Sequence, residues 1–249
     1  MASLSQAVEA LTVLAAGLLV RVGLAFLLLA VIAALMLLGL SGWRRLRGVY
    51  DWGRGIRVEG GLRYRRGLVY LPGHVWLRRG ARSSRLTLGL DDVAQRILAG
   101  DLQIRLPESG RQLRAGESLV EIGIGGRRAQ VRAPLAGRVR SSNSRLARHP
   151  DLLHTDPYGR AWLVRMQDAG GAVPGARVGT AAQSWLAEEY RRLTRYVEWH
   201  LGLAGADGGE PYLPTAQLLE EREWQHLVET FLVASPPPEP GDGGQHPSS

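Results

Sequence analysis

Two residue types with distinctive side-chain chemistry are missing from this 249-residue chain, which contains neither cysteine nor lysine. Without cysteine there is no disulfide, no thiolate metal site and no cysteine nucleophile. Without lysine, all 31 basic residues are arginine. A guanidinium group stays protonated at physiological pH and offers no free amine, so none of these side chains can accept an acyl group in an amide bond. A phosphate-binding loop with its obligatory lysine is excluded as well.

The positive charge is concentrated in one part of the chain. The formal net charge is +8. Residues 41–85 contain twelve arginines and only two acidic residues, Asp51 and Glu59, so this segment carries +10 and the remainder about −2. Such an excess predicts an anionic partner near this segment. We expect no nucleic-acid binding, because no helix-turn-helix, zinc-finger or base-stacking pattern accompanies it.

A long apolar stretch precedes the basic segment. Residues 22–40 are long enough to cross about 30 Å of hydrocarbon as a helix. A secretory signal is the competing interpretation, but its apolar core has only about 7 to 15 residues and is followed by a small-residue cleavage site, which is missing here. We therefore predict one transmembrane helix at 22–40, after an apolar or interfacial segment at 1–21.

The residues after the predicted helix indicate its orientation. By the positive-inside rule, the arginines place this side in the cytoplasm, which predicts a single-pass inner-membrane protein with a cytoplasmic domain. Arg44, Arg45 and Arg47 are candidates for contact with membrane lipid. We expect residues 41–67 to form an Arg-rich juxtamembrane linker.

The segment from Ser118 to Val139 has the pattern of a β-hairpin. Apolar and polar residues alternate up to Ile124, which predicts a half-buried strand. Gly125-Gly126 supplies a tight reversal, because glycine tolerates the positive φ that a two-residue hairpin turn needs. The return strand begins at Arg127 and ends before Pro134.

This hairpin and its surroundings resemble the lipoyl-bearing domain of glycine cleavage system H proteins. Turn sequences RAGE (114–117) and APLAG (133–137) flank the hairpin as they do in the family. The other residues that match the family's motifs are Tyr70, His74, Trp76, Asn143, Pro150, the run Asp156-Pro157-Tyr158-Gly159 and Trp162. The resemblance covers residues 68–166 and implies a mainly β fold, a lipoyl-type barrel-sandwich domain with short helices.

The resemblance also implies lipoate, which the family holds in amide linkage on a lysine at the hairpin tip. Counting from Glu121 or back from Pro134, this position falls near Ile124, Gly125 and Gly126, in a span about two residues longer than the family's usual spacing. None of these residues is lysine. We therefore expect no lipoate, no other cofactor and no enzymatic activity.

Short strands with frequent turn signals fill the predicted domain, together with one short helix at 93–98 that Asp91 or Asp92 caps. A linker at 167–179 follows. Residues 180–233 predict a C-terminal extension of two helices, the first capped by Thr180 and the second beginning at Thr215. Residues 234–249 are rich in proline, glycine and serine and predict a disordered tail.

Apart from the family resemblance, the sequence offers few residues that could form a metal or catalytic site. The six histidines lack zinc-site spacing, so we expect no metal, and His74 is expected to pack with Trp76. Paired acidic residues are explained by helix capping and solvated faces. No catalytic constellation is recognisable.

Three functional hypotheses remain. The first is a membrane-anchored, H-protein-like binding module without its lipoyl arm, which contacts a lipoyl-handling or membrane redox enzyme through Gly125, Gly126, Arg127 and Arg128. The second is a periplasmic adaptor of the membrane-fusion type. The arginine excess after the apolar helix opposes a periplasmic domain, and the coiled-coil hairpin that such adaptors insert between the two lipoyl halves is missing. The third is a working carrier of glycine cleavage, which the family's fold suggests and the missing lysine opposes.

Overall fold

The chain forms two units, Met1–Arg54 and Gly55–Ser249. The computed structural model describes residues 21–40, 42, 51–80, 85–168, 173–201 and 219–233. Three predictions therefore fall outside the described residues: nearly all of the interfacial segment 1–21, the lipid contacts of Arg44, Arg45 and Arg47, and the tail 234–249.

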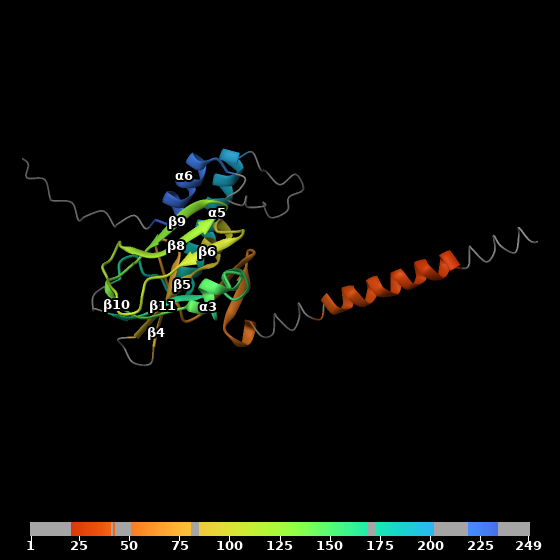
Figure 1. Cartoon of the computed structure of the whole chain (residues 1–249), viewed down its shortest axis with the longest axis horizontal. Helices are drawn as coiled ribbons and strands as arrows, with labels where there is room; N and C mark the ends of the chain where they lie inside the picture. Colours follow the sequence, from red (N-terminus) through yellow and green to blue (C-terminus); the bar gives the residue numbers. More distant parts are fainter. Residues whose placement is uncertain are drawn as a thin grey trace, which may run out of the picture. The chain divides into compact units, whose positions relative to one another are not determined.

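The first unit contains a helix from Arg21 to Leu40, drawn in red in Figure 1. The helix has 20 residues, its most apolar 18-residue window has a mean hydropathy of 2.8, and its side chains are exposed. Within the described part of the chain this helix alone is long and apolar enough to cross a membrane. Its bounds agree within one residue with the predicted span 22–40.

Three antiparallel sheets form the body of the second unit (Figure 1). The largest has the strand order β3-β4-β5-β11-β10-β7. Its strands are β3 (Val69–Leu71), β4 (Val75–Arg79), β5 (Arg85–Leu90), β7 (Gln112–Leu113), β10 (Gly137–Ser142) and β11 (Trp162–Asp168). The second sheet has the order β6-β8-β9 and comprises β6 (Leu102–Arg105), β8 (Ser118–Ile124) and β9 (Arg127–Arg132). The third pairs β1 (Ile56–Glu59) with β2 (Leu62–Arg65).

Alternating side chains build the core between these sheets. In β5, Leu86, Leu88 and Leu90 are buried, whereas Arg85 is exposed and Thr87 half-buried. In β8 the alternation begins only after Leu119, because a bulge between Ser118 and Val120 turns both Leu119 and Val120 inwards. The prediction of a mainly β fold with an N-terminal apolar helix and C-terminal helices is confirmed.

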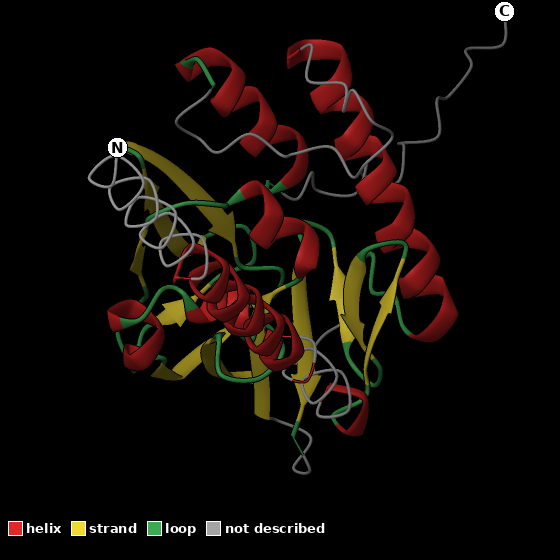
Figure 2. Cartoon of the chain, turned by 90° about the vertical axis from the view of Figure 1, so that its right-hand side faces the viewer, coloured by secondary structure: helices red, strands yellow, loops and turns green. Residues whose placement is uncertain are grey.

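Five helices accompany the sheets among the described residues of the second unit. They are α2 (Asp92–Ile97), α3 (Ser144–Arg148), α4 (Leu152–Thr155), α5 (Gly179–Leu201) and α6 (Glu221–Phe231). The buried carboxylate of Asp91 caps α2 by accepting hydrogen bonds from the backbone N–H groups of Val93 (3.0 Å) and Ala94 (3.1 Å). Figure 2 shows the helices in red beside the yellow strands, and in Figure 1 α5 and α6 are neighbours.

The starts of the two C-terminal helices differ from the prediction. Because α5 already begins at Gly179, Thr180 lies inside the helix and is not its N-cap. The second helix begins at Glu221 rather than Thr215, because a capping box between Glu220 and Glu223 satisfies the free N–H groups there. Residues 215–218 lie outside the described part of the chain.

Residues 56–65, which the sequence analysis assigned to a linker, instead form the β1–β2 hairpin. Ile56, Leu62 and Tyr64 are buried in the same core as the rest of the unit. Two tyrosine hydroxyls also hold the backbone of β2: Tyr70 donates to the carbonyl of Arg65 (3.1 Å), and Tyr158 donates to the carbonyl of Arg63 (2.7 Å). The hairpin is therefore part of the domain.

Candidate functional site: the hairpin tip and its surroundings

The β8–β9 hairpin ends in a two-residue turn. Ile124 pairs with Arg127 across the hairpin, and Gly125 and Gly126 between them have φ values of +56° and +84°. Positive φ at both turn residues is the geometry for which Gly-Gly is suited. Both glycines are exposed, whereas Ile124 is 2% exposed and packs into the core.

The two arginines after the turn lie in different surroundings. Arg127 is half-buried: it donates to the carbonyl of Leu219, just before α6, and forms an ion pair with Glu221 of α6 (3.3 Å). Arg128 is exposed, and its side chain is available on the outward face of the three-stranded sheet. Of the two, Arg128 is therefore better placed for an external partner, while Arg127 serves an internal contact.

Helix α6 is anchored against this hairpin by a buried tryptophan. The indole Nε1 of Trp224 donates to the backbone carbonyl of Arg128 (3.2 Å), and Trp224 is fully buried. On its other side, α6 packs on α5 through Phe231, whose ring lies edge-on to Tyr196 at 6.0 Å. The start of β9, next to the turn, is thus covered by a helix of the same chain.

A shallow hollow of about 330 Å³ lies next to the turn on the outward face of the three-stranded sheet. Gly123 has no side chain there and lies between Gln103 and Arg128, its partners on the neighbouring strands. Both Arg105 and Glu121 contribute to its lining. This mixture of positive and negative side chains is suited to the recognition of a polar surface.

His74 lies at the centre of a buried polar cluster. It has a left-handed backbone conformation (φ 59°), and its Nδ1 is 3.0 Å from the carboxylate of Asp91. Its ring stacks on Trp185 of α5 at 5.2 Å, and Nε2 is 3.8 Å from Glu189. The packing of His74 with Trp76 stays a prediction, and the sequence analysis did not foresee the stacking of its ring on Trp185 of α5.

The carboxylates around His74 determine its protonation. Burial by itself lowers the pKa of His74, but the charge and hydrogen bond of Asp91, aided by Glu189, raise it to about 9. The hydrogen bond from His74 correspondingly lowers the pKa of Glu189. An imidazolium enclosed by two carboxylates and a tryptophan joins α2, β4 and α5, which is a structural role.

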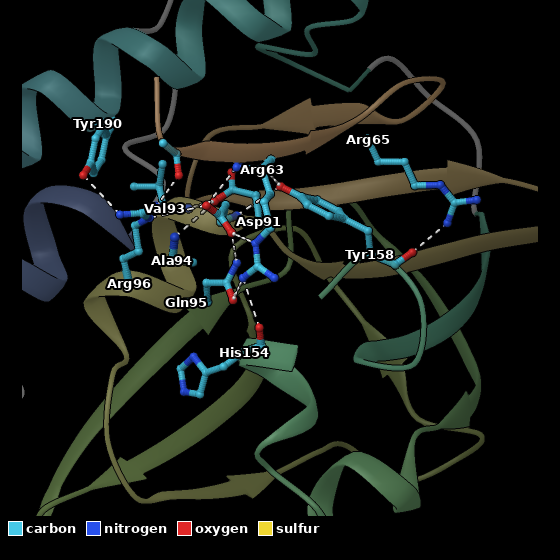
Figure 3. A network of polar contacts seen from close by, with 12 residues as sticks. Arg63, Arg65, Asp91, Val93, Ala94, Gln95, Arg96, His154, Tyr158 and Tyr190 are labelled. Atoms are coloured by element: carbon cyan, nitrogen blue, oxygen red, sulfur yellow. Dashed lines mark hydrogen bonds and ion pairs between the residues drawn. The ribbon is translucent and has the colours of Figure 1, made fainter. Parts of the chain in front are cut away.

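A second polar network fixes β2 to α2 (Figure 3). The guanidinium of Arg63 donates to Asp92 (2.9 Å), to Gln95 (3.0 Å) and to the carbonyl of His154 (3.0 Å). Burial, followed by the charge of Arg63, lowers the pKa of His154. No group of three or more potential metal ligands occurs in the described ranges.

Comparison with known proteins assigns this domain. The family model of the glycine cleavage H-protein matches residues 68–173. Glycine cleavage system H proteins of Nocardia farcinica and Halorhodospira halophila are 34% and 33% identical over 112 and 123 residues, covering 45% and 49% of this chain and 84% and 94% of their own lengths. The chain belongs to the glycine cleavage H-protein family. A crystal structure of the H protein from Mycobacterium marinum is 28% identical, covers 49% of this chain and 97% of its own, and has a TM-score of 0.43.

The family's motif residues form one part of this core. The rings of Tyr70 and Tyr158 meet edge-on at 6.3 Å, and Trp76 lies 6.4 Å from Tyr158. The segment Asp156 to Gly159 thus packs against the opening motif, although about 80 residues separate them in the sequence. In contrast, β1, β2, α5 and α6 lie outside the residues that the family model matches.

The residues at the family's lipoyl position do not fit a lipoyl group. An amide linkage requires a primary amine, but Ile124 is apolar and buried, and Gly125 and Gly126 have no side chain. Arg127 is the nearest side chain with nitrogen after the turn, and it is directed to α6. The sequence predicted the turn and a second C-terminal helix, but it carried no signal that Arg127 contacts the start of that helix and Leu219, 92 residues further along the chain.

Proposed function

We propose that this protein is a membrane-anchored H-protein-like module that carries no lipoate and works by binding another protein. The observation that carries the proposal is the absence of lysine from a domain whose family attaches its cargo to lysine. The only primary amine of the chain is the α-amino group of its N-terminus. A carrier role would need an acceptor that the hairpin does not offer.

The arrangement of the tip supports recognition by an external surface. Gly125 and Gly126 are exposed and Arg128 projects beside them, so a partner can approach the turn closely. A planar guanidinium favours carboxylates, with which it forms paired, charge-assisted hydrogen bonds. The proposed partner is a lipoyl-handling or membrane redox enzyme with an acidic patch where it receives an H-protein-like domain.

Anchoring in the membrane rests on the helix from Arg21 to Leu40 and on the charge that follows it. The length and hydropathy of the helix suit a bilayer, and the arginine excess of residues 41–85 lies on its C-terminal side. We place the domain in the cytoplasm, on the inner membrane. Protease treatment of sealed vesicles tests this: the domain should be cleaved in inverted vesicles and protected in right-side-out ones, and the opposite pattern would favour the periplasmic adaptor.

The loss of cargo is tested by the intact mass of the protein. Expressed in a host with active lipoylation, the full chain should have the mass of the bare polypeptide, apart from N-terminal processing. A conventional H protein expressed in the same cells provides the control and should gain lipoate. A lipoyl-sized increment on this chain would overturn the proposal.

The binding role is tested by recovery of partners from detergent-solubilised membranes. Arg128→Ala should reduce recovery, because it removes an exposed guanidinium without touching α6. Arg114→Ala is the matched control, since Arg114 is an exposed arginine of another loop. Arg127→Ala should reduce recovery only to the extent that it also loosens α6, which hydrogen exchange of residues 221–231 would reveal. Equal recovery by all variants would show that the tip is not the binding surface.

A further inference from the structure

A second hollow, away from the hairpin tip, lies on the outward face of the six-stranded sheet. Its volume is about 720 Å³, which is in the range of small-molecule sites. Strands β4, β5, β10 and β11 form it. Four arginines line it, one from each strand: Arg78, Arg85, Arg140 and Arg165.

The strand register explains why these side chains converge. Arg78 pairs with Thr87, Thr87 with Arg165, and Arg165 with Ser141, so these residues form one lateral row across four adjacent strands. Neighbouring strands are about 4.8 Å apart, so Arg78 and Arg165 stand about 10 Å apart on the same face. An anion between them can contact both guanidinium groups and the hydroxyl of Thr87.

Two of the four guanidinium groups are held in place. The guanidinium of Arg165 stacks on the ring of Trp162 at 4.4 Å from its centroid. Arg140, at the bulge between Val139 and Ser141, donates a hydrogen bond to the side chain of Gln167. Such contacts reduce the conformational entropy that a binding arginine loses.

The charge of this face is unbalanced. Among the described residues that line the hollow there is no acidic side chain, and Thr87, Ser141 and Gln167 add neutral polar groups. Four positive charges within one hollow repel each other, and a bound anion relieves this repulsion. A phosphate group fits best, because it has several acceptor oxygens and pairs with two guanidinium groups at once.

We infer that this arginine face, defined as Arg78, Arg85, Arg140 and Arg165, binds a phosphate-bearing ligand. The chemistry is the same for a soluble phosphorylated metabolite and for the headgroup of an anionic phospholipid. Among the described residues that line the hollow there is no aromatic side chain, and the nearby ring of Trp162 is covered by Arg165. It therefore lacks free aromatic surfaces for base stacking, which favours phosphate over a nucleic acid.

Two probes distinguish the sources of phosphate. The full chain in uncharged detergent is titrated with inorganic pyrophosphate by calorimetry. The full chain is also reconstituted into nanodiscs of phosphatidylcholine with or without phosphatidylglycerol, and hydrogen exchange is measured in β5, β10 and β11. Pyrophosphate binding indicates a soluble ligand, and protection that needs phosphatidylglycerol indicates a headgroup; either result supports the site.

Matched variants make the result specific. Arg140→Gln with Arg165→Gln should weaken either response roughly tenfold or more, because two charge-assisted contacts are lost. Arg114→Gln with Arg145→Gln removes the same charge from exposed positions elsewhere and should leave the response unchanged. Arg165→Lys keeps the charge but not the planar stacking on Trp162, and should give an intermediate loss.

Three results would overturn the inference. They are the absence of any response to both probes, an equal loss in the control pair, and tighter binding of a single-stranded oligonucleotide than of pyrophosphate. All the substituted side chains are exposed, so each variant should fold like the wild type. Near-UV circular dichroism of each variant checks that it does.

Discussion

Removing the charge of Asp91 tests the electrostatic centre of the domain. His74 is 1% exposed, and its pKa rises from 6.5 to about 9 on folding. A difference of about 2.5 pH units corresponds to about 3 kcal/mol of folding free energy. Because the folded pKa is the higher one, this stability is fully present below pH 6.5 and is lost as the pH rises through 9.

Asp91→Asn separates the charge from the helix cap. The asparagine oxygen can still accept hydrogen bonds from Val93 and Ala94, so α2 keeps its N-cap. His74 then retains only Glu189 at 3.8 Å, and Arg192 shares that carboxylate at 3.6 Å. Burial therefore dominates, and the pKa of His74 should fall towards or below its ordinary value. At pH 6.5 the variant should be about 3 kcal/mol less stable than the wild type, and the gap should narrow towards pH 9.5.

The measurement is urea unfolding of the full chain in non-ionic detergent, followed by tryptophan fluorescence between pH 6.5 and 9.5. It gives the slope of the free energy of unfolding against pH. The lowered pKa of His154 affects stability only below pH 6.5, so it does not disturb this window. Asp101→Asn removes an exposed carboxylate and should keep the wild-type slope. Equal slopes for Asp91→Asn and the wild type, or a flat wild-type profile, would refute the assignment of charge to His74.

Three further substitutions test packing. Gly89→Ala should destabilise the domain by about 1–3 kcal/mol in urea unfolding, because the added Cβ would lie 2.3 Å from the ring of Trp76. Tyr158→Phe should cost about 1–3 kcal/mol, because the backbone N–H of Asp92 and the carbonyl of Arg63 both lose their hydroxyl partner. Trp224→Ala should weaken the packing of α6 on β9 by about 3–5 kcal/mol, because a fully buried ring and its hydrogen bond are lost. Hydrogen exchange in residues 221–231 and in β9 should therefore increase.

Each of these substitutions has its own control. Gly53→Ala has no atom within 4 Å of the added Cβ and should be neutral, so an equal loss there would exclude a specific clash with Trp76. Tyr64→Phe removes a hydroxyl from the same region and should cost less than Tyr158→Phe. Trp224→Phe keeps most of the buried ring and should release α6 far less than alanine does; identical exchange in both variants would mean that packing does not hold the helix.

Local patterns in the sequence predicted the elements that are stabilised by residues close to one another in the chain. The β8–β9 hairpin follows from alternation and from two adjacent glycines, and α2 follows from the capping carboxylate of Asp91. These features depend on residues within a few positions of one another. The predicted small domain over residues 68–166 rested on motif residues that do pack together in the core, such as Tyr70 and Tyr158.

Features that depend on distant partners were missed or misplaced. The segment 56–65 is rich in arginine and resembled a linker, yet the hydroxyl of Tyr158, 95 residues away from Arg63, helps to hold it as a strand. The side chain of Arg127 was expected to face a partner, yet it forms an ion pair with Glu221 of α6. A polar residue's partner is set by topology, which alternation and charge do not encode.

The hairpin tip and α6 are joined by contacts that lie partly outside the family match. The indole of Trp224 and the ion pair of Glu221 with Arg127 tie the start of β9 to a helix outside the family match. These contacts restrict the motion of the tip, which is consistent with the fixed recognition surface proposed above. The helix covers one side of the tip, while Gly125, Gly126 and Arg128 are exposed, as the proposed recognition surface requires.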